Sequence, residues 1–164
     1  VINKPGYVST KATYNLAPGA ERLAIFHIKT PAQITADERA AKFAAEREAN
    51  CSGVDLIIEK WSWGRTSDMF VKAEGLVTNV SGRSLNNVVA KIVFFTKDGE
   101  FISSEEALID YRPVLNGQSS PFSVIAPYNP AMARAKLELA AFWGNTYRIT
   151  DRKTWNKYQC GSTR

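Results

Sequence analysis

The stretch that decides the fold runs from Met69 to Pro127, and its middle reads VVAKIVFFTKDGEFISSEEAL from Val88 to Leu108. The apolar run at its start is rich in β-branched and aromatic residues, which favour strands. The Asp98-Gly99 pair that follows is typical of a tight turn, because glycine reaches positive φ without strain. The stretch therefore predicts strand, turn and strand, as in one half of an antiparallel sandwich.

The rest of the chain from Val54 onward shows the same strand-forming pattern. Six or seven short strands at regular spacing predict an immunoglobulin-like antiparallel β-sandwich, so the fold class is mainly β with an N-terminal arm and one α-helix. We expect strands at 54–64, 69–80, 87–96, 101–111, 120–126 and 135–143, with a continuation at 146–149. The expected core is Val77, Val88, Ile92, Phe94, Phe122, Val124, Leu137 and Leu139.

The N-terminal third has a different pattern. Breakers at Pro5-Gly6 and Pro18-Gly19 predict an irregular arm over residues 1–22, followed by a short apolar strand at 23–28. Thr35 and Glu38 match a capping box and predict a helix that begins there and ends near Asn50. This helix either packs on the sandwich through Phe43 or binds a partner. We therefore expect an arm and helix at 1–53, a sandwich at 54–150 and a basic tail at 151–164.

The charge of the chain is unevenly distributed. The net charge of +5 divides into +2 for residues 1–53, −1 for 54–144 and +4 for 145–164. A nucleic-acid-binding domain usually carries its basic stripe on the folded body, so we expect no nucleic acid partner. The tail is either a solvated basic segment or a contact for an acidic partner or anionic surface.

Two cysteines, Cys51 and Cys160, are far apart in the sequence and neither belongs to a CxxC pair. With His27 as the single histidine, a zinc site is not expected. Two interpretations are open: two separate reduced thiols, or one disulfide that ties both flanks of the sandwich together in an oxidising compartment. The second is favoured.

A series of short motifs runs through residues 69–143. It consists of Gly75, Val77 and Asn79, then Ser81-Gly82, Val88 to Phe95, Asp98-Gly99, Leu115 and Gly117, and Pro121-Phe122. In this order the motifs resemble the FxLYD-type domain, a bacterial immunoglobulin-like module found in extracytoplasmic proteins and lipoproteins. The chain departs from that pattern in having Thr96-Lys97 after its aromatic pair and a turn element shortened by one residue. The resemblance implies a periplasmic or secreted protein with no general catalytic site.

Motifs for catalysis are missing from the sequence. There is no GxxxxGK[ST] or GxGxxG nucleotide loop and no GxSxG nucleophile elbow. Glu105 and Glu106 are adjacent, so on a strand they point to opposite faces and would not cooperate as acid and base. His27 lies in an apolar run and is interpreted as structural. We expect no enzyme, no cofactor and no catalytic residue.

Aromatic residues are the remaining candidates for binding. Trp61 and Trp63 share one face of a strand, and Trp155 and Tyr158 lie in the basic tail, which Trp143 flanks. Exposed tryptophans stack on sugars or anchor protein partners, whereas a structural tryptophan covers the edge of a core. The tentative binding residues are therefore Trp61, Trp63, Trp155 and Tyr158.

The sequence thus predicts a non-catalytic extracytoplasmic module that binds a protein partner or supports a cell-envelope assembly. The alternative is a carbohydrate- or small-ligand-binding module that uses its surface tryptophans. No apolar run approaches the length of a transmembrane helix. The chain starts at Val1 without a signal-peptide pattern, so proximity to a membrane would depend on a signal or lipid anchor already removed.

Overall fold

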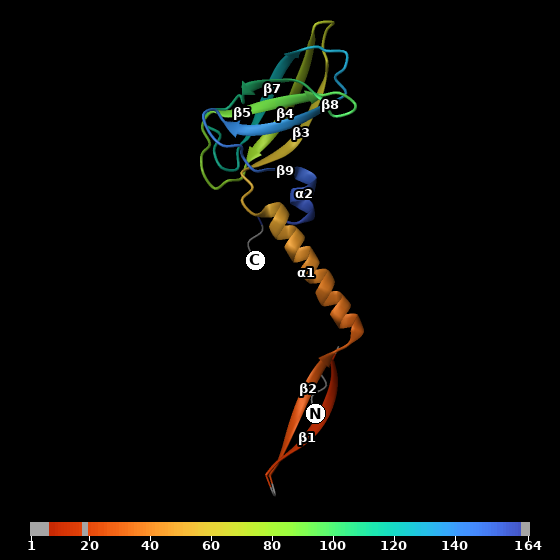
Figure 1. The fold of residues 1–164 in the computed structure, drawn as a ribbon. Helices are drawn as coiled ribbons and strands as arrows, with labels where there is room; N and C mark the ends of the chain where they lie inside the picture. Colours follow the sequence, from red (N-terminus) through yellow and green to blue (C-terminus); the bar gives the residue numbers. More distant parts are fainter. Residues whose placement is uncertain (1–6, 18–19, 162–164) are drawn as a thin grey trace. The chain divides into compact units, whose positions relative to one another are not determined.

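The chain forms two compact units, Val1–Glu46 and Arg47–Arg164, and each is described by itself. The structure is a computed structural model that describes residues 7–17 and 20–161, with side chains from residue 29 onward. Strands account for most of the regular structure, and they form one hairpin in the first unit and two sheets in the second (Figure 1).

The first unit begins with a β-hairpin where an irregular arm was expected. Strands β1 (Tyr7–Ala17) and β2 (Ala20–Lys29) pair antiparallel, with Tyr7 opposite Lys29 and Ala17 opposite Ala20. The expectation was wrong because proline and glycine separate the two strands in sequence and do not interrupt either one. His27 lies on β2 opposite Ser9, and its side chain is outside the described residues.

Helix α1 (Pro31–Cys51) begins earlier than the capping-box pattern predicted. The amides of Gln33 and Ile34 donate to the Thr30 carbonyl, and the Thr30 hydroxyl also accepts from Gln33. Proline is favoured at the first helical position because its missing N–H costs nothing there. Thr35 is therefore inside the helix, where its hydroxyl donates to the Pro31 carbonyl. No residue of α1 is buried.

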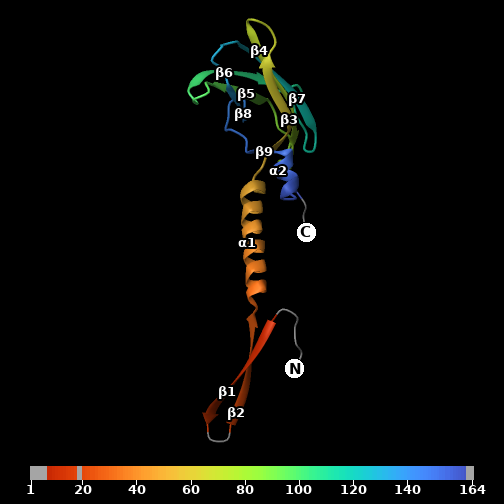
Figure 2. The same cartoon turned by 90° about the vertical axis from the view of Figure 1, so that its right-hand side faces the viewer.

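The second unit is the predicted sandwich, with one sheet of four strands and one of three (Figures 1 and 2). The strand order is β7-β4-β3-β9 in the first sheet and β6-β5-β8 in the second. All neighbours are antiparallel except β3 and β9, which pair in parallel. The strands are β3 (Leu56–Arg65), β4 (Phe70–Asn79), β5 (Val88–Phe95), β6 (Phe101–Leu108), β7 (Ser119–Pro127), β8 (Arg134–Ala141) and β9 (Ile149–Asp151).

The core lies between these two sheets, and its predicted members are confirmed. All eight expected residues, Val77, Val88, Ile92, Phe94, Phe122, Val124, Leu137 and Leu139, are buried. Alternation along β7 shows how this arises, because Phe122, Val124 and Ala126 face inward while Ser123 and Ile125 face outward.

The C-terminal segment is more ordered than the tail that was expected. After β9 the chain forms a short second helix, α2 (Arg152–Lys157), whose N-cap Asp151 accepts a hydrogen bond from the Thr154 amide at 2.8 Å. The sequence pattern missed α2 because it has only six residues and no apolar stripe. Figure 2 shows α2 beside β9, at the end of the sandwich where β3 begins.

Candidate functional site

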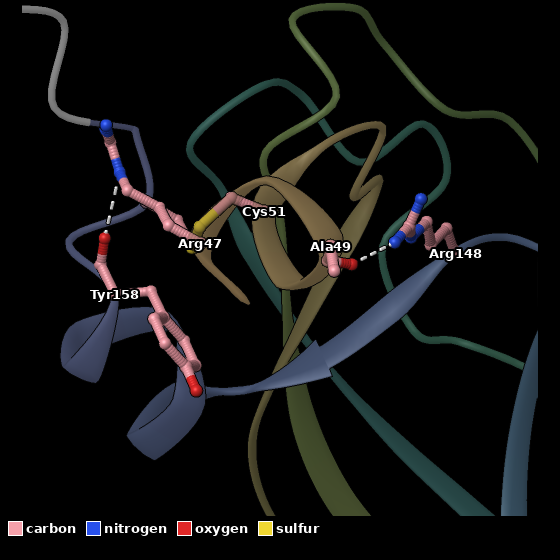
Figure 3. Close-up of a disulfide and its surroundings, with 6 residues drawn as sticks. Arg47, Ala49, Cys51, Arg148 and Tyr158 are labelled. Atoms are coloured by element: carbon pink, nitrogen blue, oxygen red, sulfur yellow. Dashed lines mark hydrogen bonds between the residues drawn. A yellow bond between two sulfur atoms is a disulfide. The ribbon is translucent and has the colours of Figure 1, made fainter. Parts of the chain in front are cut away.

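The two cysteines form a disulfide that joins the last turn of α1 to the segment after α2. Two hydrogen bonds accompany this link (Figure 3): Arg47 Nε donates to the Tyr158 carbonyl at 3.1 Å, and the Arg148 guanidinium donates to the Ala49 carbonyl. The favoured interpretation of Cys51 and Cys160 is confirmed. We call this arrangement the disulfide clamp.

Two of the predicted binding residues, Trp155 and Tyr158, belong to the clamp. The Tyr158 side chain is buried, and Lys157 Nζ lies 4.5 Å from the centre of its ring and 2.9 Å from its hydroxyl. Trp155 is half-buried and packs so closely over Gly161 that a Cβ there would lie 2.9 Å from the indole. Both aromatic side chains therefore hold α2 and the chain end in place.

A polar network fastens α2 to the four-stranded sheet. The Arg152 guanidinium forms a two-pronged ion pair with Glu59, whose Oε2 lies 2.7 Å from Arg152 Nε. Thr78 donates to the same carboxylate and lies 2.8 Å from the Ser119 hydroxyl. The hydrogen bonds from Arg152 lower the pKa of Glu59 most strongly, and the bond from Thr78 lowers it further.

The other two predicted binding residues lie at the edge of the core. Trp61 and Trp63 are half-buried and pack against the buried cluster. Their cross-strand partners are Gly75 and Ala73, which are opposite the buried Phe122 and Val124, so both tryptophans stand on the inner face of the sheet. The Trp63 ring meets Phe94 edge-on, with 5.5 Å between ring centres. Neither indole forms a flat, fully exposed platform.

A pocket of about 540 Å³ is lined by residues from both faces of the same sheet. The outward residues Ser62, Glu74 and Ser123 lie in one cross-strand row through β3, β4 and β7. The Glu74 carboxylate is paired with Lys72, which lowers the pKa of Glu74. The pocket is lined by Lys60, Trp61, Ser62, Glu74, Gly75, Asp110, Pro121, Phe122 and Ser123.

An exposed apolar patch lies on the outer face of this sheet, toward the β3–β4 turn. Phe70 pairs with Pro127, and Lys72 pairs with Ile125, so all four side chains share the outer face. Ile125 is 60% exposed and Phe70 42%, and Pro127 is also exposed. We call Phe70, Ile125 and Pro127 the outer-face patch. Its residues are contiguous by register, unlike the single surface apolar residues that every protein has.

The sequence analysis did not single out this patch. Its residues come from the start of β4 and from the solvent side of β7, and only the register between β4 and β7 brings them together. A sequence signal does exist, because Ile125 interrupts the alternation of β7 with an apolar residue at an outward position. Trp143, which the sequence places beside the basic tail, is 92% exposed at the turn after β8 and meets Phe142 edge-on.

Other kinds of site are not found in the described part of the chain. Residues 29–161 contain no group of three His, Cys, Asp or Glu side chains placed to hold a metal ion. No helix among the described residues has the length and apolar composition needed to cross a bilayer. Comparison with protein-family models and with curated proteins found no match to this chain.

Proposed function

We propose that this chain is a non-catalytic, FxLYD-like interaction module of a cell-envelope assembly, and that it binds a protein partner with the outer face of its four-stranded sheet. The observation that carries the proposal is the outer-face patch, which lies on the same face of the sheet as the polar row Ser62, Glu74 and Ser123. Exposed apolar side chains next to polar ones are the composition of a protein-binding surface, with anchors in the centre and a polar rim.

The disulfide clamp supports a location outside the cytoplasm. Cys51 and Cys160 are bonded, and disulfides persist in oxidising compartments but are rare where glutathione keeps thiols reduced. The sequence resemblance to extracytoplasmic FxLYD-type domains supports the same location. We propose a periplasmic or secreted protein.

Affinity capture with matched variants tests the proposal. The full chain is immobilised and exposed to an envelope extract of the source cells, in parallel with Phe70→Glu and with Phe101→Glu. Phe101 is a good control because it is equally apolar, 65% exposed and located on the other sheet. A partner retained by wild type and Phe101→Glu but lost with Phe70→Glu supports the proposal. Equal retention by all three baits contradicts it.

The carbohydrate-binding alternative has one observation in its favour. The pocket combines an aromatic residue, Trp61, with the polar side chains of Lys60, Glu74 and Asp110. A glycan array probed with the full chain tests it. Binding that is lost in Asp110→Ala and kept in Phe70→Glu would favour the glycan, and an array without signal removes the alternative.

A further inference from the structure

Strand β7 is an edge of the four-stranded sheet, and half of that edge is uncovered. The Pro121 carbonyl accepts from the Asp110 amide at 3.0 Å, so the backbone groups of residue 121 point away from β4. Strand alternation then directs the backbone groups of Ser123 and Ile125 outward as well. No described residue forms a hydrogen bond with them. This part of β7 presents a row of unused donors and acceptors.

This edge is protected only by its two prolines and by no charged side chain. Natural edge strands are protected by charged side chains, bulges or prolines, but Ser119–Pro127 contains no charged residue. The other edges of the sandwich do carry charges, with Glu106 on β6 and Lys136 and Glu138 on β8. Pro121 and Pro127 bound the uncovered part of β7, which leaves a window of residues 122–126 open to pairing.

Strand β6, which contacts β7 from the other sheet, carries two polar side chains on its inner face, Ser103 and Glu105. On β6, Ser103 and Glu105 are paired with the buried residues Phe94 and Ile92, so both stand on the inner face. The Ser103 hydroxyl is inaccessible to solvent and has no hydrogen-bond partner among the described residues. An inward charge such as Glu105 can protect an edge, but that role does not explain the unpaired hydroxyl.

We propose that the β7 edge binds an extended segment of the partner as an additional antiparallel strand, and that this segment places a basic side chain beside Glu105. The proposal rests on the proposed function and specifies how the partner is bound. Main-chain hydrogen bonds to Ser123 and Ile125 supply affinity. Alternate side chains of the added strand point to the outer-face patch around Ile125 and to the inner face, where the exposed Glu105 of β6 stands. The requirement for a basic residue supplies specificity.

Selection from a phage-displayed library of random linear dodecapeptides on the immobilised full chain tests this proposal and does not require the partner to be identified first. Selected peptides should alternate β-branched and polar residues around a lysine or arginine. Ile125→Pro removes one outward N–H at a position where an edge strand tolerates proline, and should weaken their binding about tenfold. Ile125→Thr keeps the N–H and should retain binding. Glu105→Lys should select acidic peptides in place of basic ones.

Ala135→Pro provides the matched control, because β8 is also an edge strand. The Tyr147 amide donates to the Leu139 carbonyl, so odd-numbered residues of β8 point outward there. Peptide binding should be unchanged in this variant. The proposal would be overturned if Ile125→Pro and Ala135→Pro weakened peptide binding equally. It would also be overturned if Glu105→Lys selected peptides of the same charge as wild type, or if no peptide were selected at all. Sedimentation of a wild-type dimer that Ile125→Pro dissociates would also overturn it, because the occupant would then be a second copy of the chain.

The strand-addition proposal and the proposed function can fail separately. If affinity capture depends on Phe70 while no peptide uses the β7 edge, strand addition is wrong and the proposed binding face stands. If peptides bind the β7 edge while Phe70→Glu captures the same proteins as wild type, the proposed role of the patch is wrong.

Discussion

Gly75 stands on the inner sheet face at a position without room for a side chain. A Cβ at this residue would lie 2.5 Å from the Lys60 carbonyl oxygen and 2.7 Å from both Phe122 Cε1 and Trp61 Cβ. These neighbours are a backbone atom and two core side chains, so none of them moves easily. The glycine is needed for space and not for an unusual φ.

We expect Gly75→Ala to destabilise the protein by about 1 to 3 kcal/mol, the usual range for overpacking a core. Gly64→Ala is the matched control, since that glycine lies on neighbouring β3 and nothing lies within 4 Å of its added Cβ. Urea unfolding followed by tryptophan fluorescence measures both. A Gly75→Ala variant as stable as Gly64→Ala would contradict the packing described for the Trp61, Gly75 and Phe122 row.

Glu59 gives a prediction about pH. Its pKa is lowered below the usual 4.5 by Arg152 and Thr78, so ionised Glu59 stabilises the folded state. The contribution is fully present above pH 4.5 and is lost as the pH falls through the lower pKa of the folded state. Wild type should therefore exceed Glu59→Gln in unfolding free energy at about pH 6, and the difference should shrink toward about pH 3. The Glu100→Gln variant, on the exposed β5–β6 turn, serves as control. A difference that is the same at both pH values would be evidence against the ion pair.

At the scale of elements, the disulfide clamp determines how the chain end is held. The bond closes a loop with a sequence separation of 109 residues, for which chain-entropy arithmetic gives a stabilisation of about 4 to 5 kcal/mol as an upper figure. Thermal unfolding with and without reductant should show a markedly lower midpoint for the reduced protein. Cys51→Ser with Cys160→Ser should match the reduced form and should not respond to reductant. Identical midpoints for the oxidised and reduced wild type would contradict a structural role.

The sequence predicted some elements better than others, for physical reasons. Strand β5 was predictable from its long apolar run. It pairs with β6 on one side and β8 on the other, and buries residues on both of its faces. The β1–β2 hairpin was missed because Pro18-Gly19 indicates only that one segment ends and another begins. It does not indicate whether the two segments pair with each other. Strand β9 was expected to continue β8, but it pairs in parallel with β3. A pairing over three residues depends on tertiary contacts that no local pattern encodes.

At the scale of the whole molecule, the candidate site was only partly predictable. Trp61, Trp63, Trp155 and Tyr158 were chosen for residue type, and the structure places all four in packed environments. Residue type does not reveal which face of a strand a side chain occupies once a bulge intervenes, as it does between Ile58 and Lys60. The sequence did not predict the outer-face patch because Phe70 lies beside Ile125 and Pro127 only through the pairing of β4 with β7.

The central claim is that a partner binds the outer face of the four-stranded sheet at Ile125. The most direct measurement is photo-cross-linking in the source cells, with a photoreactive amino acid placed at position 125 or at position 115. Leu115 is the control because it is 56% exposed in the turn that precedes β7. A covalent protein adduct formed from position 125 and not from position 115 is the predicted result. No adduct at position 125, or the same adducts from both positions, would contradict the claim.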